Sequence, residues 1–227
     1  MILPVSILTC PRRRHLWLAQ IRYLINRHFP TFKRGFDILV AAALLILLSP
    51  LMVAVAIGIK LESPGPVFFR QVRIGELGRP FQLWKFRSMV VDAEARRRAL
   101  ENDESMSGGV RFKIKRDPRI TRIGFWLRRL SIDELPQLLN VVLGEMSLVG
   151  PRPPIPQEVA AYDLHERRRL DSKPGLTCIW QVSGRSLIPF DEQVLMDIDY
   201  SQRQSWTLDL KLLIRTVPAV LRGRGAC

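Results

Sequence analysis

Residues 38–59 read ILVAAALLILLSPLMVAVAIGI and contain no charged side chain. As one straight helix these 22 residues would extend about 33 Å, enough to cross the hydrocarbon core of a bilayer. Such a length favours a membrane helix over a helix buried in a soluble core. A membrane helix here would determine on which side of the bilayer the rest of the chain folds.

Two features of the apolar segment oppose a simple crossing. Ser49 and Pro50 interrupt its middle, where proline removes a backbone donor and clashes with the preceding turn. Seven basic residues precede Asp37 and the remaining 28 begin with Lys60, so a single crossing would place one basic flank outside, against the positive-inside tendency. We predict a re-entrant helix that breaks at Ser49 and Pro50 and returns to the same face. A kinked span is the alternative.

The flanking sequence predicts three parts. Residues 1–32 form a basic arm, for which an interfacial helix and a loosely ordered segment both stay open. Residues 33–61 form the re-entrant helix, and Lys33, Arg34 and Asp37 are expected to anchor its start at the headgroups. Residues 62–227 form a cytosolic catalytic domain.

The soluble part has the texture of an α+β domain. Residues 67–73 and 81–86 are predicted to be short strands around a glycine-bearing turn. Capping and breaker residues predict helices over residues 92–100, 134–143, 156–171, 190–201 and 207–221. The expected fold is mainly helical with a small antiparallel sheet, in a monotopic membrane protein.

Composition narrows the partners and the compartment. The chain carries 35 Lys and Arg against 21 Asp and Glu, a net charge of +14, which favours nucleic acid, anionic lipid or phosphorylated substrates. Three cysteines without a CxxC pair indicate neither a disulfide framework nor a zinc site, and they fit a reducing compartment. The glycine loops GxGxxG and GxxxxGK[ST] are absent from the sequence.

An acidic pair follows two arginines in residues 127–137, LRRLSIDELPQ. Because Pro136 is tolerated only in the first turn of a helix, we expect a helix to start near Asp133, with this residue as its cap. The helix dipole and the arginines would then favour an ionised Asp133. An ionised carboxylate is what a nucleophile on phosphorus or a Mg²⁺ ligand must be. A capping box of Ser131 and Glu134 is the structural alternative.

Further basic residues are candidates for binding phosphate. Prolines hold Arg152 in the run GPRPP, which would reduce the entropy lost on gripping an anion, although the run also suits a proline-rich connector. Arg185 follows a glycine and offers a bidentate fork. Lys85 and Arg87 in KFRSM either face the same anion or lie in solvent.

These blocks together resemble the bacterial sugar transferases, the monotopic phosphoglycosyl transferases that begin surface glycan assembly on a polyprenyl phosphate carrier. The resemblance runs from about residue 33 to residue 225. It rests on KRxxD at 33–37, SP at 49–50, FRQ at 69–71, KFRSM at 85–89, DPR at 117–119, SIDELPQ at 131–137, SLVGPRP at 147–153 and WQVSGR at 180–185.

The resemblance implies roles for individual residues. Asp133 would be the nucleophile and Glu134 its partner, with Mg²⁺ on the substrate diphosphate and Asp133 near or ligating the metal. Arg128, Arg152 and Arg185 match arginines expected around the phosphates or nucleotide. Asp209 matches a family acid of unassigned role. The membrane helix of the family is re-entrant through its Ser-Pro break, in agreement with the argument from charge.

The implied reaction transfers a sugar 1-phosphate from a UDP-sugar to polyprenyl (undecaprenyl) phosphate through a covalent aspartyl-phosphosugar. It would start exopolysaccharide, capsule, O-antigen or glycoprotein glycan synthesis at the cytosolic face of the bacterial inner membrane. The expected partners are the UDP-sugar, the polyprenyl phosphate and membrane lipids, without nucleic acid, and a homodimer is left open. The alternatives are a metal-dependent lipid-diphosphate phosphohydrolase and a non-enzymatic, membrane-tethered basic module.

Overall fold

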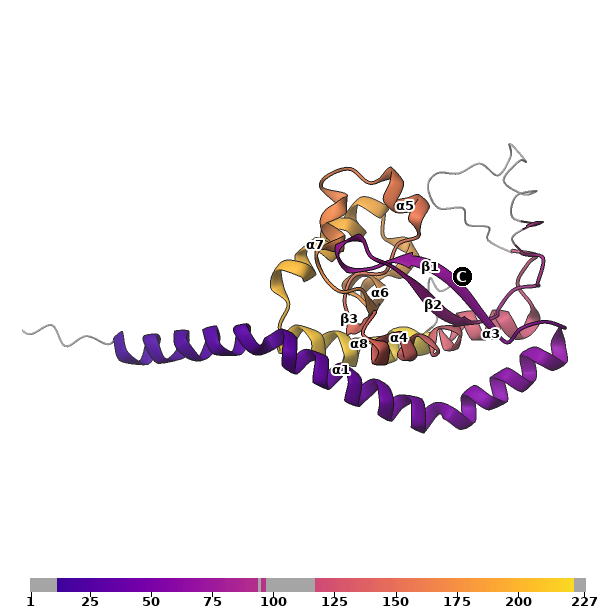
Figure 1. Cartoon of the computed structure of the whole chain (residues 1–227), viewed down its shortest axis with the longest axis horizontal. Coiled ribbons are helices and arrows are strands. Elements are labelled where there is room, and N and C mark those ends of the chain that lie inside the picture. Colours follow the sequence, from indigo (N-terminus) through magenta and orange to yellow (C-terminus); the bar gives the residue numbers. More distant parts are fainter. Residues whose placement is uncertain (1–11, 94, 97–116, 223–227) are drawn as a thin grey trace, which may run out of the picture.

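The computed structural model describes residues 12–93, 95–96 and 117–222, and for residues 12–28 only the backbone. It confirms a mainly helical fold with a small antiparallel sheet (Figure 1). The predicted helix over residues 92–100 lies largely outside the described residues. The short elements of the body pack on one another along the long helix α1 (Figure 1).

The apolar segment belongs to helix α1 (Arg12–Glu62), which extends upstream into the predicted basic arm as far as Arg12. Its part Phe29–Glu62 is long and apolar enough to cross a membrane, and only 6% of the most apolar window is buried. This exposure excludes a helix buried in a soluble core and indicates association with a membrane.

Helix α1 is bent rather than straight (Figure 1), and Pro30 and Pro50 lie inside it. Proline is the usual cause of such a bend because it lacks an amide hydrogen and clashes with the preceding turn. Pro50 would have bonded to the carbonyl of Ile46 four residues earlier. The Ser49 hydroxyl donates to that carbonyl at 2.8 Å instead, so the Ser-Pro pair supplies its own replacement hydrogen bond.

The start of the apolar segment is fastened to the body of the protein. Lys33 forms an ion pair with Asp209, and Arg34 donates to the carbonyls of Val141 and Val142. The Asp37 carboxylate accepts from the Ser147 hydroxyl at 2.7 Å and from the Leu148 amide at 3.3 Å. The expectation that these three side chains anchor the helix at the headgroups was therefore wrong: Lys33 and Asp37 are buried against protein.

The other end of α1 is fastened to the same body. The Glu62 carboxylate accepts from the backbone amides of Arg122 and Ile123 at 2.7 and 3.1 Å. These amides open helix α3 (Arg122–Arg129) and would otherwise lack partners. Arg87 donates to the carbonyls of Ser63 and Pro64 just beyond α1.

The predicted strands form an antiparallel hairpin of β1 (Phe68–Ile74) and β2 (Pro80–Phe86). Its register pairs Phe68 with Phe86 and Ile74 with Pro80. Residues paired across a hairpin share one face, so Arg73, Gln71 and Leu83 project to the same side as Lys85. This face of the hairpin therefore directs the charged side chains of Arg73 and Lys85 toward the interior of the fold.

A second sheet joins segments distant in sequence. Strand β3 (Ser147–Val149) pairs in parallel with β4 (Gly175–Thr177), and the sequence did not predict it because each strand has only three residues. A Cβ on Gly175 would lie 2.0 Å from the Gly150 nitrogen. The two backbones therefore approach as closely as only glycine permits.

Most of the predicted helices are present. The helices α7 (Phe190–Arg203) and α8 (Trp206–Arg222) confirm the predictions over residues 190–201 and 207–221. The helix predicted over residues 156–171 is instead split into α5 (Pro156–Ala161) and the 3₁₀ helix η4 (Glu166–Asp171). Helix α4 (Gln137–Leu143) ends as predicted at Gly144, which has φ 93°. The other short helices within the described ranges are η1 (Glu76–Gly78), η3 (Ile132–Glu134), α6 (Ile179–Ser183) and η5 (Arg185–Leu187).

The close approach of β3 and β4 predicts a steric effect. Gly175→Ala should lower the free energy of unfolding by at least about 2 kcal/mol, because a backbone contact cannot relax as a side chain does. Gly35→Ala is the control, since a Cβ there meets nothing within 4 Å and alanine favours a helix. Thermal unfolding in one detergent measures both. Equal melting temperatures for Gly175→Ala and the wild type would contradict this packing.

Candidate active site

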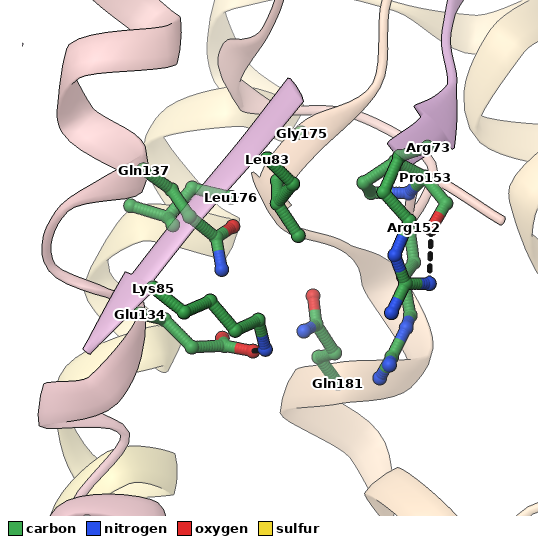
Figure 2. Close-up of a pocket in the computed structure, with 10 residues that line it drawn as sticks. All are labelled: Arg73, Leu83, Lys85, Glu134, Gln137, Arg152, Pro153, Gly175, Leu176 and Gln181. Carbon is green, nitrogen blue, oxygen red and sulfur yellow. Dashed lines mark hydrogen bonds and ion pairs between the residues drawn. The ribbon is translucent and has the colours of Figure 1, made fainter. Parts of the chain in front are cut away.

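A recess of about 260 Å³ lies between the inner face of the hairpin, the acidic turn and the segments after β3 and β4 (Figure 2). It brings together chain segments more than 100 residues apart. The ten residues that line it are Arg73, Leu83, Lys85, Glu134, Gln137, Arg152, Pro153, Gly175, Leu176 and Gln181.

The acidic pair lies in the 3₁₀ helix η3, not at a helix cap. The chain leaves α3 through Ser131, whose φ of 54° is left-handed, and its side chain forms no cap hydrogen bond. Helix α4 (Gln137–Leu143) begins only after Pro136. The expectation that Asp133 caps the helix was wrong, and so was the capping box of Ser131 and Glu134. The tight left-handed turn instead directs Asp133 into the protein, where it is 7% exposed.

Lys85 ties the two carboxyl groups together. Its Nζ lies 2.7 Å from Glu134 Oε1 and 3.9 Å from Asp133 Oδ2. The lysine was predicted to bind phosphate, and the structure places it on the acidic pair at the wall of the recess. A cation shared by two carboxylates reduces their mutual repulsion, which allows them to remain adjacent in a buried place.

The two carboxyl groups have different acidities. Burial raises the pKa of Asp133 to about 6, against the opposing charges of Lys85 and Arg128. Burial also acts to raise the pKa of Glu134, but Lys85 and Arg152 outweigh it and lower that pKa to about 2. The expected lowering of the Asp133 pKa by Arg128 is present, but burial outweighs it, so the net shift is opposite to the expected one. Near neutral pH Glu134 is charged, and Asp133 is largely charged but poorly solvated.

Hydrogen bonds to its carbonyl groups hold the run of residues 150–154 in place. The Gly175 amide donates to the Pro151 carbonyl at 2.9 Å, the Arg73 guanidinium to that of Pro153 at 2.9 Å, and the Ile74 amide to that of Pro154 at 2.9 Å. The backbone on both sides of Arg152 is thus fixed. Arg152 and Arg73 lie together across the recess from Lys85 and Glu134 (Figure 2).

The structure brings together part of the predicted site. Glu134, Lys85 and Arg152 line the recess. Asp133 lies beside it, with Oδ2 3.9 Å from Lys85 Nζ, and the charge of Arg128 acts on Asp133. Three other predicted site residues lie elsewhere. Arg185 is half-buried in η5 and does not line the recess, Asp209 pairs with Lys33 and Tyr200, and Arg87 is directed to the carbonyls after α1.

Three recess residues with polar side chains, Arg73, Gln137 and Gln181, were not among the predicted site residues. Arg73 could have been found from strand alternation, because it lies two residues from Gln71 on the face that carries Lys85. Gln137 follows Glu134 by one helical turn, so the two were expected on one side. No sequence pattern around Gln181 predicts its place in the site, since only the tertiary fold brings α6 to the recess.

The carboxylates at the recess restrict how a metal ion is held. The described part of the chain contains no group of three His, Cys, Asp or Glu side chains placed to hold a metal. Glu134 is engaged with Lys85, which leaves Asp133 as the carboxylate suited to a metal. Mg²⁺ commonly takes one or two carboxylates and completes its shell with substrate phosphates and water. The donor set therefore fits Mg²⁺ only when a phosphorylated substrate supplies further oxygens.

Comparison with known proteins matches residues 28–223 to the family described as Bacterial sugar transferase. The chain is 48% identical over 166 residues to the galactosyl transferase CpsE of Streptococcus agalactiae, covering 73% of this chain and 37% of CpsE. It is 41% identical over 200 residues to the exopolysaccharide production protein ExoY of Rhizobium meliloti, covering 86% and 87%.

A third relative is the undecaprenyl-phosphate galactose phosphotransferase of Salmonella typhimurium. It is 41% identical over 208 residues, covering 89% of this chain and 43% of the relative. The chain thus spans less than half of the length of two of these relatives and most of the length of ExoY.

The burial of Asp133 predicts a pH-dependent effect on stability. Its pKa is raised from 3.8 to about 6, so ionisation of Asp133 opposes folding above pH 6 and has no effect below about pH 4. At pH 8 the free energy of unfolding of Asp133→Asn should therefore exceed that of the wild type by up to about 3 kcal/mol, and its melting temperature should be higher. This advantage should shrink as the pH falls through 6. Asp171→Asn, at an exposed position, is the control, and a pH-independent difference for Asp133→Asn would contradict the burial of its charge.

Proposed function

The chain belongs to the bacterial sugar transferase family, and on that premise we propose that it transfers a sugar 1-phosphate from a UDP-sugar to polyprenyl (undecaprenyl) phosphate. The products are polyprenyl-diphospho-sugar and UMP, as the first step of surface polysaccharide synthesis. The name of the Salmonella relative supports this acceptor. The observation that carries the proposal is a buried aspartate beside a recess lined by Lys85, Arg73 and Arg152.

The transfer proceeds in two displacements at one phosphorus. An Asp133 carboxylate oxygen bonds to the phosphorus that carries the sugar, and the bond to the UMP oxygen breaks, so UMP leaves with the electron pair. An oxygen of polyprenyl phosphate then attacks the same phosphorus. The acyl-phosphate bond breaks and Asp133 returns as a carboxylate. Poor solvation favours Asp133 as a nucleophile, because little water must be removed before it attacks.

The surrounding charges have separate tasks. Arg73 and Arg152 face the position where negative charge accumulates on the phosphates, and their rigid support reduces reorganisation during the reaction. Glu134, with a pKa of about 2, stays ionised and holds Lys85 beside Asp133. We therefore assign Glu134 to positioning Lys85 rather than to carrying a proton. Mg²⁺, proposed as the cofactor, would be held by Asp133 and the diphosphate and would neutralise charge there.

The membrane segment fits the location of the acceptor. Lys33 and Asp37 fasten one end of the apolar stretch to the body and Glu62 fastens the other. A body attached to both ends favours a segment that enters and leaves on one face, in agreement with the positive charge on both flanks. The protein is accordingly a re-entrant membrane protein with its body on the cytosolic face of the cytoplasmic membrane. The site then lies near the plane of the lipid phosphates.

The mechanism predicts unequal losses of activity. Asp133→Asn should reduce UMP release from a UDP-sugar by at least about a thousandfold, as expected for the loss of a nucleophile. Glu134→Gln should reduce it by roughly 10- to 100-fold, because Lys85 loses its partner. Asp171→Asn should keep wild-type activity. UMP release is measured with polyprenyl phosphate and Mg²⁺, and full activity of Asp133→Asn would exclude the mechanism.

The topology predicts accessibility from one side. In a protein whose native cysteines are replaced, Thr31→Cys and Pro64→Cys mark the two ends of the apolar stretch at exposed positions. Both should react with an impermeant maleimide in inside-out vesicles and resist it in intact spheroplasts. Leu164→Cys, on the exposed surface of the body, gives the cytosolic reference. Labelling of Thr31→Cys in spheroplasts would indicate a span and contradict the re-entrant path.

A further inference from the structure

The carboxamide groups of Gln137 and Gln181 point into the recess near Lys85 and Glu134 (Figure 2). Gln137 lines the recess and is 4% exposed. The Oε1 atom of Gln181 is buried without a hydrogen-bond partner in the described chain. An unpaired buried polar group costs about 1–3 kcal/mol, and native proteins rarely leave such groups unsatisfied. The Gln181 amide is therefore arranged for a ligand, and Gln137 faces the same space.

The chemistry of a carboxamide restricts which part of a UDP-sugar it binds. Each amide offers both donor hydrogens and an acceptor oxygen. An ionised phosphate only accepts, so it would leave the acceptor of Gln181 unpaired. Hydroxyl groups, and the imide edge of a uracil, both donate and accept. The phosphates have matching partners in Arg73 and Arg152, which leaves the two glutamines for a neutral polar group.

The position of Gln137 selects the sugar over the nucleoside. Gln137 lines the recess together with Glu134, the residue that directly follows Asp133. In an in-line displacement the attacking and leaving oxygens lie on opposite sides of the phosphorus. UMP therefore departs on the side away from Asp133, and a residue on the wall that carries Glu134 meets the group that stays bound. That group is the phosphosugar.

The apolar part of the lining agrees with this choice. Leu83 and Leu176 supply apolar walls between the polar groups, as expected for a surface that packs against a sugar ring and reads its hydroxyls.

We propose that Gln137, together with Gln181, binds hydroxyl groups of the transferred sugar and thereby sets selectivity among UDP-sugars. The inference rests on the proposed transfer reaction, because it takes the UDP-sugar as the ligand. A site built to bond a hydroxyl rejects an analogue without it, since its own amides are then left unpaired. Replacing the amide should remove this rejection.

The test compares Gln137→Leu and the isosteric Gln137→Glu with the wild type on UDP-glucose, UDP-galactose and their single-deoxy analogues. In the wild type, removal of the sugar hydroxyl that Gln137 binds should lower kcat/KM by about 100-fold or more. In Gln137→Leu the same removal should lower it by less than about fivefold, and the ratio for glucose over galactose should change by at least about tenfold. Gln202→Leu, at an exposed position of α7, should behave as the wild type.

A binding measurement decides the inference independently of turnover. By equilibrium dialysis, Gln137→Leu should bind the preferred UDP-sugar at least about tenfold more weakly than the wild type and bind UMP within about twofold of it. Parallel weakening of both ligands would assign Gln137 to the nucleoside and overturn the proposal. Unchanged selectivity and unchanged discrimination against the deoxy analogues would also overturn it. Absence of UMP release by the wild type would instead contradict the proposed transfer.

Discussion

Lys85 connects the hairpin to the acidic turn, and the proposed chemistry depends on that contact. Its ammonium lies 2.7 Å from Glu134 and 3.9 Å from Asp133. Without a cation, two adjacent carboxylates in a buried turn would raise each other's pKa until one became neutral. With Lys85 bound to Glu134, one carboxylate holds the cation and the other remains able to react. The different roles of Asp133 and Glu134 thus follow from the position of Lys85 on β2.

The acidic turn is also linked mechanically to the membrane. Arg34 of α1 donates to the last carbonyls of α4, the helix that directly follows the acidic turn. Asp37 bonds to β3, which leads into the run that carries Arg152. Both walls of the recess are therefore fixed to the start of the apolar segment. An acceptor held in the lipid plane would then meet the recess at a constant height, which reduces the entropy lost on reaching the transition state.

Local patterns predicted those parts of the structure that depend on local forces. Strand alternation predicted the hairpin, and the Ser-Pro pair predicted an interruption where α1 bends. Non-local contacts could not be predicted in this way: β3 and β4 are too short to show a pattern, and their pairing depends on Gly150 meeting Gly175. The placement of Asp133 was missed because the left-handed turn at Ser131 is unusual for a residue other than glycine. Burial then raised the pKa of Asp133, although the cations of Lys85 and Arg128 act to lower it.

In the proposed mechanism Asp133 accepts the phosphosugar before the lipid does. Isotope exchange tests it directly: the protein is incubated with a UDP-sugar, Mg²⁺ and radiolabelled UMP in the absence of polyprenyl phosphate. A covalent intermediate predicts that label enters the UDP-sugar, and that Asp133→Asn abolishes this exchange. Transfer to added polyprenyl phosphate by a protein that shows no exchange would contradict the account, because the sugar phosphate would then pass to the lipid in one step.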